Sequence, residues 1–239
     1  HAICIHPNKN VAPCCVYMPK KYLQYKDNWQ DHFNKQGIQS ESGFIPECHD
    51  CEWEDKEEGH SWKDVLNKKL VGSEGITYWD IKFSNTCNLA CRMCRPGDSS
   101  TWKQIITDDY TDPYYKQFRE ATWHKDIDLV LSQIRSVKYL KFTGGEPFMI
   151  PQVWRVLDKC IELDIAKDIE VYITTNATML KHLDKLKQFK KVEILASIDA
   201  IGERYEYIRP GAKWQEVKEN ILELNRQFDL AVTALPFIF

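Results

Sequence analysis

Residues 78–94 read YWDIKFSNTCNLACRMC, a run of β-forming residues followed by three cysteines within eight positions. Cysteines placed directly after a strand lie where βα enzymes carry their chemistry. Thiolates are the usual ligands of iron–sulfur clusters, and three thiolates leave one iron of a [4Fe–4S] cluster open. The stretch predicts a catalytic cluster site at Cys87, Cys91 and Cys94, while a zinc knuckle that borrows a fourth ligand stays open as the alternative.

Working outward from this stretch, short β-rich runs alternate with helical patterns, which predicts βα units around a parallel sheet. The expected strands are Tyr78–Ser84, Tyr139–Thr143, Glu170–Thr175, Val192–Ile198 and Ala231–Phe237. The expected helices are Pro151–Leu163, Thr178–Lys187 and Lys213–Phe228, with a polar, aromatic-rich helical insertion over Asp98–Asp128. A closed eight-stranded barrel needs roughly 250 residues. We therefore expect an α/β fold with a partial (β/α) barrel, truncated at its C-terminus.

The first 75 residues differ in composition, because Cys, Pro, His, Trp and charged residues dominate them. They contain one strand-like piece, Ala2–His6, followed by a turn at Pro7–Asn10. Because these residues include too few apolar side chains to build a large core, a bound metal or cluster would have to stabilise this region. We expect two domains: a small Cys-rich β-hairpin module over residues 1–75 and the barrel over residues 76–239.

A second motif lies one predicted strand after the cysteines, at Gly144-Gly145-Glu146-Pro147. Together with the C-x3-C-x2-C spacing, it resembles the radical S-adenosylmethionine (radical SAM) superfamily. The resemblance implies an enzyme in which the open iron of a [4Fe–4S] cluster chelates S-adenosylmethionine. Reductive cleavage then yields a 5′-deoxyadenosyl radical that abstracts hydrogen from a peptide or small-molecule substrate. The cofactors carry the difficult chemistry and the protein positions them.

The resemblance also implies roles for residues at the strand ends. Met93 stands where the family often has an aromatic residue on the adenine, and a thioether can fill that role. Glu146 would accept a hydrogen bond from the ammonium group of S-adenosylmethionine, and Arg209 would pair with the carboxylate of the same ligand. The implied cofactor-binding set is Met93, Gly144, Gly145, Glu146, Pro147, Asn176, Ser197, Asp199 and Arg209.

The N-terminal cysteines resemble the auxiliary cluster modules called SPASM or twitch domains. The implied ligands are Cys14, Cys48 and Cys51, with Cys15 as a possible substitute and a further cysteine expected before His1. Such modules usually follow the barrel, so one ahead of it departs from the family pattern. A zinc knuckle completed by His49 or His60 stays open. Cys4 is expected to be a strand side chain and Cys160 a core residue.

Composition limits the classes of partner. The chain carries 32 basic and 35 acidic side chains, a formal charge of −3, without basic blocks. This favours a small-molecule or peptide substrate over nucleic acid, and a radical SAM enzyme also needs an electron donor such as flavodoxin or ferredoxin. No signal peptide or membrane span is visible. Nine cysteines, seven of them clustered, favour metal in a reducing compartment, so we expect a cytoplasmic protein. The other classes left open are a zinc-stabilised binding protein without catalysis and an inactive radical SAM relative.

Overall fold

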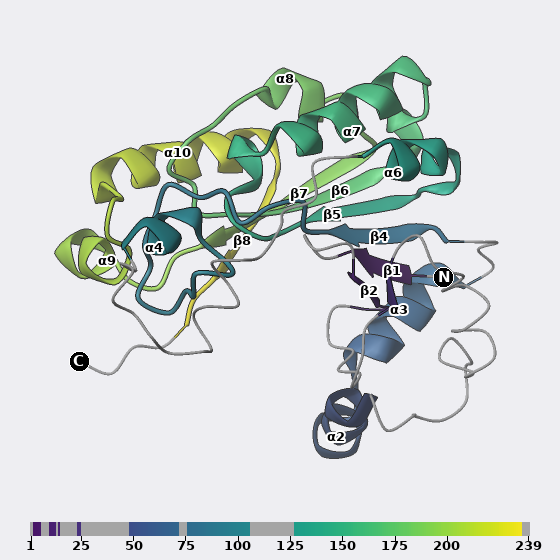
Figure 1. Cartoon of the computed structure of the whole chain (residues 1–239), viewed down its shortest axis with the longest axis horizontal. Helices are drawn as coiled ribbons and strands as arrows, with labels where there is room; N and C mark the ends of the chain where they lie inside the picture. Colours follow the sequence, from purple (N-terminus) through teal and green to yellow (C-terminus); the bar gives the residue numbers. More distant parts are fainter. Residues whose placement is uncertain are drawn as a thin grey trace.

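The computed structural model describes residues 2–5, 10–12, 14, 23–24, 48–71, 76–105 and 127–235. Its centre is an eight-stranded sheet in the order β3-β2-β1-β4-β5-β6-β7-β8 (Figure 1). The strands are β1 Ala2–Ile5, β2 Asn10–Ala12, β3 Leu23–Gln24, β4 Tyr78–Ile81, β5 Tyr139–Phe142, β6 Glu170–Thr175, β7 Lys191–Ser197 and β8 Asp229–Thr233. Neighbouring strands are parallel from β1 through β4 to β8, whereas β2 and β3 are antiparallel additions.

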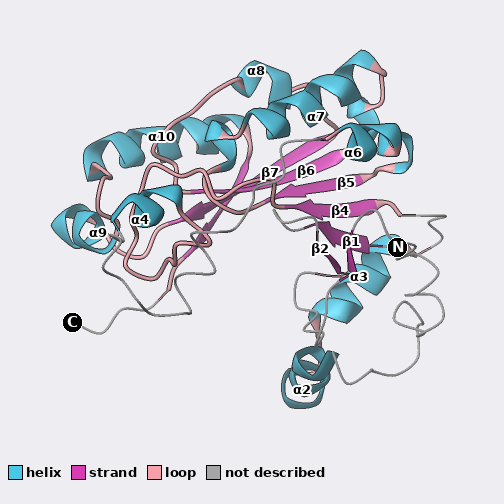
Figure 2. Cartoon of the chain, in the orientation of Figure 1, coloured by secondary structure: helices cyan, strands magenta, loops and turns pink. Residues whose placement is uncertain are grey.

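Helices lie on both faces of this sheet (Figure 2). They are α2 His49–Glu58, α3 Trp62–Leu70, α4 Ser100–Ile105, α6 Asp128–Ser132, α7 Pro151–Glu162, α8 Leu183–Leu186, α9 Gly202–Ile208 and α10 Trp214–Gln227. Short 3-10 turns occupy Ile134–Ser136, Pro147–Met149 and Ala166–Asp168. The α/β fold with a parallel, partial (β/α) barrel sheet is confirmed. No helix in these described ranges is both long enough and apolar enough to span a membrane.

The main core lies between the sheet and helices α6, α7, α8 and α10, which all cover one face in Figure 1. Alternate strand residues point to this face because side chains alternate across a strand. Leu140, Val171 and Val192 form one buried row across β5, β6 and β7. Val153 and Leu157 of α7 belong to the same buried cluster, which also contains Cys160, as expected from its apolar helix face.

The opposite face of the sheet carries polar and aromatic side chains, and α3 packs against it at the start of β4. Trp62 of α3 packs edge-on against Tyr78, with the ring centroids 6.4 Å apart. The Lys69 ammonium group lies over the rings of Tyr139 and Tyr172. It also donates a hydrogen bond to the Tyr172 hydroxyl at 2.5 Å. The interior of the partial barrel is therefore lined by charged and aromatic groups at this end.

Most predicted elements are found, with shifted ends. The strand predicted over Glu170–Thr175 is confirmed with the same bounds. The helix predicted over Thr178–Lys187 is wrong in its first half, since only Leu183–Leu186 is helical. Ala177 and His182 have positive φ angles of 56° and 54°, which a right-handed helix cannot contain.

The N-terminal strands join the sheet of the barrel without a break. β1 pairs in parallel with β4, and Ile3 and Ile5 belong to the main buried cluster. Cys4 is buried on β1, as expected for a strand side chain. The division into residues 1–75 and 76–239 stays a prediction, and it does not coincide with an edge of the sheet. Of the predicted Pro7–Asn10 turn, residues 7–9 lie outside the described part, while Asn10 starts β2.

Candidate metal centre

The cysteine segment, residues 84–98, follows β4 and forms the centre of the site. Cys87 and Cys91 are buried, and Cys94 is partly buried. The Cys94 amide donates to the Cys91 carbonyl at 2.9 Å, which turns these two cysteines toward each other. The structure thus brings all three predicted cysteines into one compact segment.

Burial and mutual contact shift the pKa values of the three thiols. Desolvation is the main cause that raises the pKa of Cys87. A hydrogen bond between Cys91 and Cys94 raises the pKa of Cys91 and lowers that of Cys94. Since metal ligation requires thiolates, metal binding to this segment would release protons and weaken at low pH.

N–H groups from three parts of the chain point at two of these sulfurs. The Leu89 amide donates to Cys87 Sγ at 3.5 Å, and Asn176 Nδ2 donates to the same atom at 3.7 Å. Arg209 Nη1 donates to Cys91 Sγ at 3.6 Å. Such donors stabilise the charged form of a sulfur ligand. The site is therefore built to hold negative charge on its sulfurs.

The Gly-Gly turn after β5 approaches the cysteine segment closely. The Glu146 amide donates to the Thr86 carbonyl at 2.8 Å. Gly145 has φ +33°, and a Cβ at this position would lie 2.2 Å from that carbonyl oxygen. Gly144 has φ +79° and lies against Ser84. Only glycines fit this conformation and this separation together.

We expect Gly145→Ala to destabilise the chain by about 3–5 kcal/mol, because left-handed strain and overpacking add. Gly202→Ala is the matched control. Its φ is +61°, but a Cβ there meets nothing within 4 Å, so about 1–2 kcal/mol is expected. Urea unfolding of both variants measures the difference, and equal losses would show that the contact with Thr86 is not tight.

Glu146 is fully buried and joins the ends of β5 and β6. Its carboxylate accepts from the Phe148 amide at 3.1 Å, the Thr175 hydroxyl at 2.8 Å and the Asn176 amide at 2.8 Å. Desolvation outweighs these bonds and raises the pKa of Glu146 to about 7. The contact between Glu146 and an ammonium group stays a prediction; in this structure the three donors on the carboxylate come from the protein.

This burial predicts a pH dependence of stability. Because the folded pKa of Glu146 lies above its ordinary value of 4.5, the folded chain binds the proton more tightly. The contribution is complete below pH 4.5 and is lost as pH rises to about 7, an effect of up to about 3 kcal/mol. Unfolding of wild type and Glu146→Gln at several pH values measures it. The unfolding free energy of Glu146→Gln should not fall over this pH range. The same pH dependence in both proteins would contradict the assignment. Glu162→Gln, which replaces an exposed glutamate, serves as the control.

Asn176, at the end of β6, links three loops of the site. Besides its contact with Cys87, its amide nitrogen donates to Asn88 Oδ1 at 3.1 Å. Asn88 in turn donates to the Thr178 hydroxyl at 2.9 Å. The predicted site residue therefore lies beside the cysteines and is fixed there by a network of side chains.

Arg209 and Asp199 form a buried ion pair next to Cys91. Arg209 Nε and Asp199 Oδ2 are 2.7 Å apart, with side-chain exposures of 8% and 1%. Asp199 also accepts from the Leu235 amide at 2.9 Å. The predicted contact of Arg209 with a ligand carboxylate stays a prediction, but the structure places its guanidinium against the cysteine site.

The other predicted positions surround this centre less closely. Ser197 is the last residue of β7 and is partly buried. Pro147 is buried and begins a 3-10 turn. Met93 is partly buried and packs against the main core. Their roles toward a cofactor stay predictions.

The N-terminal cysteines lie at the start of α2. Cys48 is the N-cap residue and Cys51 is buried within the helix. Backbone amides of Trp62 and Lys63 donate to the Cys51 sulfur, although desolvation still raises its pKa. Cys14 is partly buried against the core. Cys15 lies outside the described residues.

Among the described residues, neither cysteine group forms a cage for a single ion. Within the described ranges, no three His, Cys, Asp or Glu side chains gather around one metal-ion position. A zinc knuckle needs four ligands at about 2.0–2.3 Å from one ion. In a [4Fe–4S] cluster each thiolate binds a different iron, so the sulfurs need not meet at one point.

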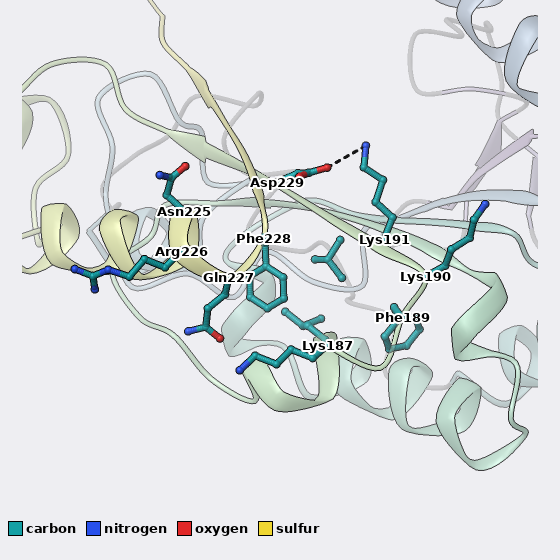
Figure 3. Close-up of a pocket in the computed structure, with 11 residues that line it drawn as sticks. Lys187, Phe189, Lys190, Lys191, Asn225, Arg226, Gln227, Phe228 and Asp229 are labelled. Carbon is teal, nitrogen blue, oxygen red and sulfur yellow. Dashed lines mark ion pairs between the residues drawn. The ribbon is translucent and has the colours of Figure 1, made fainter.

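A polar hollow of about 480 Å³ lies at the opposite end of the strands, where β7 and β8 begin (Figure 3). Lys187, Lys190, Lys191 and Arg226 line it together with Phe189. Each of these cations already has a carboxylate partner, as the Lys191–Asp229 pair in Figure 3 shows. The hollow is separate from the cysteine segment.

Sequence reasoning missed the residues that support the cysteine segment from its two sides. Ser99, Ser100, Thr101 and Trp102 donate hydrogen bonds to its backbone carbonyls. On the other side, the carbonyls of Ile208 and Pro210 accept from its amides. The run of three hydroxyl residues that begins five positions after Cys94 was the available signal.

Comparison with known families supports what this geometry suggests. The family model of the radical SAM superfamily matches residues 81–238. The chain belongs to the radical SAM superfamily. Membership implies a [4Fe–4S] cluster and S-adenosylmethionine as cofactors, so the radical SAM resemblance of the two motifs is confirmed.

Relatives of this radical SAM chain include GTP 3′,8-cyclases. The Staphylococcus epidermidis protein is 32% identical over 145 residues, covering 58% of this chain and 38% of the relative. The Alkaliphilus oremlandii protein is 27% identical over 161 residues, covering 66% and 46%. The chain thus spans less than half the length of these curated relatives.

Among solved structures, native anSMEcpe with bound AdoMet is 15% identical with a TM-score of 0.45, covering 65% of this chain and 44% of that one. Streptococcus suis SuiB bound to S-adenosylmethionine is 16% identical with a TM-score of 0.42, covering 86% and 45%. These likenesses are weak and add nothing to the assignment to the radical SAM superfamily.

The residues present fit the cluster that the radical SAM family implies. The donor set is three cysteines, two of them buried, with N–H donors already aimed at the sulfurs of Cys87 and Cys91. Arg209 supplies a buried positive charge beside them. Thiolate ligands that accept N–H hydrogen bonds are typical of iron–sulfur sites, and a nearby positive charge offsets part of their negative charge.

Proposed function

We propose that this chain forms the cofactor-binding part of a radical SAM enzyme. Cys87, Cys91 and Cys94 would hold the [4Fe–4S] cluster. The single observation that carries the proposal is that donors from the cysteine segment, β6 and α9 converge on the cysteine sulfurs. Buried thiols that only pack in a core need no N–H donors aimed at their sulfurs.

When bound, the cluster supplies the electron that cleaves S-adenosylmethionine and so generates the radical that takes hydrogen from a substrate. The chain's own residues bind and orient. Asn176 and Arg209 hold the sulfurs in place through their N–H groups. Asp199 fixes the direction of the Arg209 guanidinium, leaving its remaining N–H groups for a carboxylate.

The remaining members of the predicted set would shape the S-adenosylmethionine site. Gly144 and Gly145 allow the backbone to come close to a ligand at the end of β5. Glu146 holds Asn176 and Thr175 in position from within the protein. Ser197, Pro147 and Met93 would contribute contacts around the same ligand, by the resemblance to the family.

The substrate we propose is polar, either a peptide or a small molecule. The face of the sheet that lines the partial barrel carries Asp80, Lys141 and Tyr172, with Asp80 and Lys141 2.8 Å apart. Such a lining fits hydrogen-bonding groups better than an apolar substrate. The GTP 3′,8-cyclase relatives are named for a nucleotide, which supports a small molecule as one of the two substrate classes. An electron donor such as flavodoxin or ferredoxin would reduce the cluster.

We also propose that residues 1–75 bind a second, auxiliary cluster through Cys14, Cys48 and Cys51, with Cys15 as substitute. The support is local: Cys51 is buried and receives amides from the start of α3, an arrangement that suits a thiolate ligand. Zinc at the same residues is the competing occupant, and metal analysis of the Cys14, Cys48 and Cys51 alanine variant separates the two. Loss of iron supports the auxiliary cluster, and loss of zinc contradicts it.

Reductive cleavage tests the main proposal. The chain is reconstituted anaerobically with iron and sulfide, reduced with dithionite and incubated with S-adenosylmethionine. We expect 5′-deoxyadenosine and methionine in equal amounts. If a chain with its full complement of iron and sulfide forms no 5′-deoxyadenosine, the function is not the one proposed.

A further inference from the structure

The carbonyl groups of the cysteine segment are turned toward the start of α4. Side chains of four consecutive residues reach them. The Ser99 hydroxyl donates to Leu89 O at 2.6 Å, Thr101 to Cys87 O at 2.8 Å and Trp102 Nε1 to Cys91 O at 2.7 Å. The bonded carbonyls thus belong to every second residue from Cys87 to Cys91.

Ser100 completes this contact from both directions. Its hydroxyl oxygen accepts from the Cys87 amide and donates to the Cys87 carbonyl, both at 3.1 Å. On the far side of the segment, the Ala90 amide donates to Pro210 O at 3.2 Å and the Arg92 amide to Ile208 O at 2.9 Å. The cysteines are therefore held between the start of α4 and the end of α9.

Trp102 acts at the point where the last two cysteines turn. The Cys91 carbonyl accepts both the Trp102 indole at 2.7 Å and the Cys94 amide at 2.9 Å. Among the described residues, the Trp102 indole is the donor to this carbonyl from outside the turn. The Trp102 indole thus bonds the same carbonyl that closes the Cys91–Cys94 turn.

We propose that Ser99, Ser100, Thr101 and Trp102, here called the α4 clamp, are positioning residues for the iron–sulfur cluster, and that Trp102 fixes the Cys91–Cys94 turn. The inference rests on the proposed function. Hydrogen bonds and backbone dipoles around cysteine ligands tune the stability and potential of a cluster. Buried carbonyls need donors in any fold, so a purely structural clamp would affect only stability.

Trp102→Phe tests this distinction, because phenylalanine keeps an aromatic ring and removes the N–H. Trp79→Phe is the matched control, since the Trp79 indole donates to the Ile76 carbonyl at 3.1 Å, at the start of β4 and away from the cysteines. Outer-sphere substitutions typically weaken metal binding 10–100-fold. We expect iron loss to a chelator to become about tenfold faster in Trp102→Phe and to stay unchanged in Trp79→Phe.

The reduced cluster gives a second readout. Its EPR spectrum and midpoint potential should change in Trp102→Phe and in Thr101→Val, while Thr101→Ser, which keeps the hydroxyl, restores them. Loss of thermal stability in Trp102→Phe with wild-type iron retention, spectrum and potential would reduce the clamp to a structural contact and overturn the proposal.

A metal-free readout separates this inference from the proposed function. In the chain without iron, hydrogen exchange at the Cys94 amide should become faster in Trp102→Phe than in Trp79→Phe. Equal exchange in both variants overturns the clamp whether or not the chain binds iron. Failure of the wild-type chain to take up iron, by contrast, overturns the proposed function.

Discussion

Replacing Cys91 with alanine should abolish iron–sulfur loading of the barrel site and, with it, formation of 5′-deoxyadenosine. Cys91 is buried at 3% exposure between Arg209 and Cys94. Its loss leaves two thiolates and an Arg209 guanidinium without its sulfur partner. A cluster of this type has about four irons, so iron content should fall by about that number per chain.

The matched control is Cys160→Ala. Cys160 is buried to 0% exposure on α7 and belongs to the apolar core. Removing its sulfur should lower stability through a small cavity and leave the iron content unchanged. Iron and sulfide analysis of both variants decides the matter: equal iron in Cys91→Ala and wild type would remove Cys91 from the ligand set.

Asp199→Asn should cost about 3–5 kcal/mol of unfolding free energy, since breaking a buried pair leaves an uncompensated charge. Arg209 would remain buried with its Nε no longer opposite a carboxylate. The Leu235 amide would keep an oxygen partner only if the new amide group were oriented toward it. Urea unfolding of the metal-free chain measures this cost without the cofactor.

Asp158→Asn provides the comparison. Asp158 pairs with Lys185 at 2.5 Å, but the two side chains are 49% and 35% exposed. Exposed pairs contribute below about 1 kcal/mol, so the variant should unfold almost like wild type. Similar losses for the two aspartates would mean that burial does not set the energy of the Asp199–Arg209 pair.

The fold was predictable where a single periodic pattern ran without interruption. The alternation over Glu170–Thr175 and the apolar spacing of Pro151–Leu163 both identified elements that the structure confirms within a residue. Thr178–Lys187 failed because periodicity does not report φ angles, and Ala177 and His182 have left-handed backbones. α3 escaped notice although Ser61, its N-cap, accepts from the Asp64 amide, a recognisable helix start.

The parallel pairing of β1 with β4 also could not be deduced. It joins residues about 75 positions apart in the sequence, such as Ile3 and Trp79. The difference in composition between the two regions instead predicted that they belong to separate domains. Pairing between distant segments depends on tertiary packing, which short-range patterns do not record.

The site was predictable in its motifs and not in its internal bonds. Cysteine spacing and the Gly-Gly turn identified the segments that meet. That Glu146 is fully buried follows only from how β5 and β6 end together. Trp102 lies in the helical insertion predicted over Asp98–Asp128, and the pattern gave no sign that its indole N–H would donate to Cys91 O. Such contacts depend on loop geometry rather than on residue type.

The most direct measurement of the central claim is the EPR spectrum of the reduced, reconstituted chain with and without S-adenosylmethionine. Three cysteine ligands leave one iron without a protein thiolate, so the spectrum should change on addition of S-adenosylmethionine as that iron gains a new ligand. The Cys91→Ala variant should lack the signal that responds to S-adenosylmethionine. An unchanged spectrum in a fully loaded chain, or zinc in place of iron at Cys87, Cys91 and Cys94, would contradict the assignment.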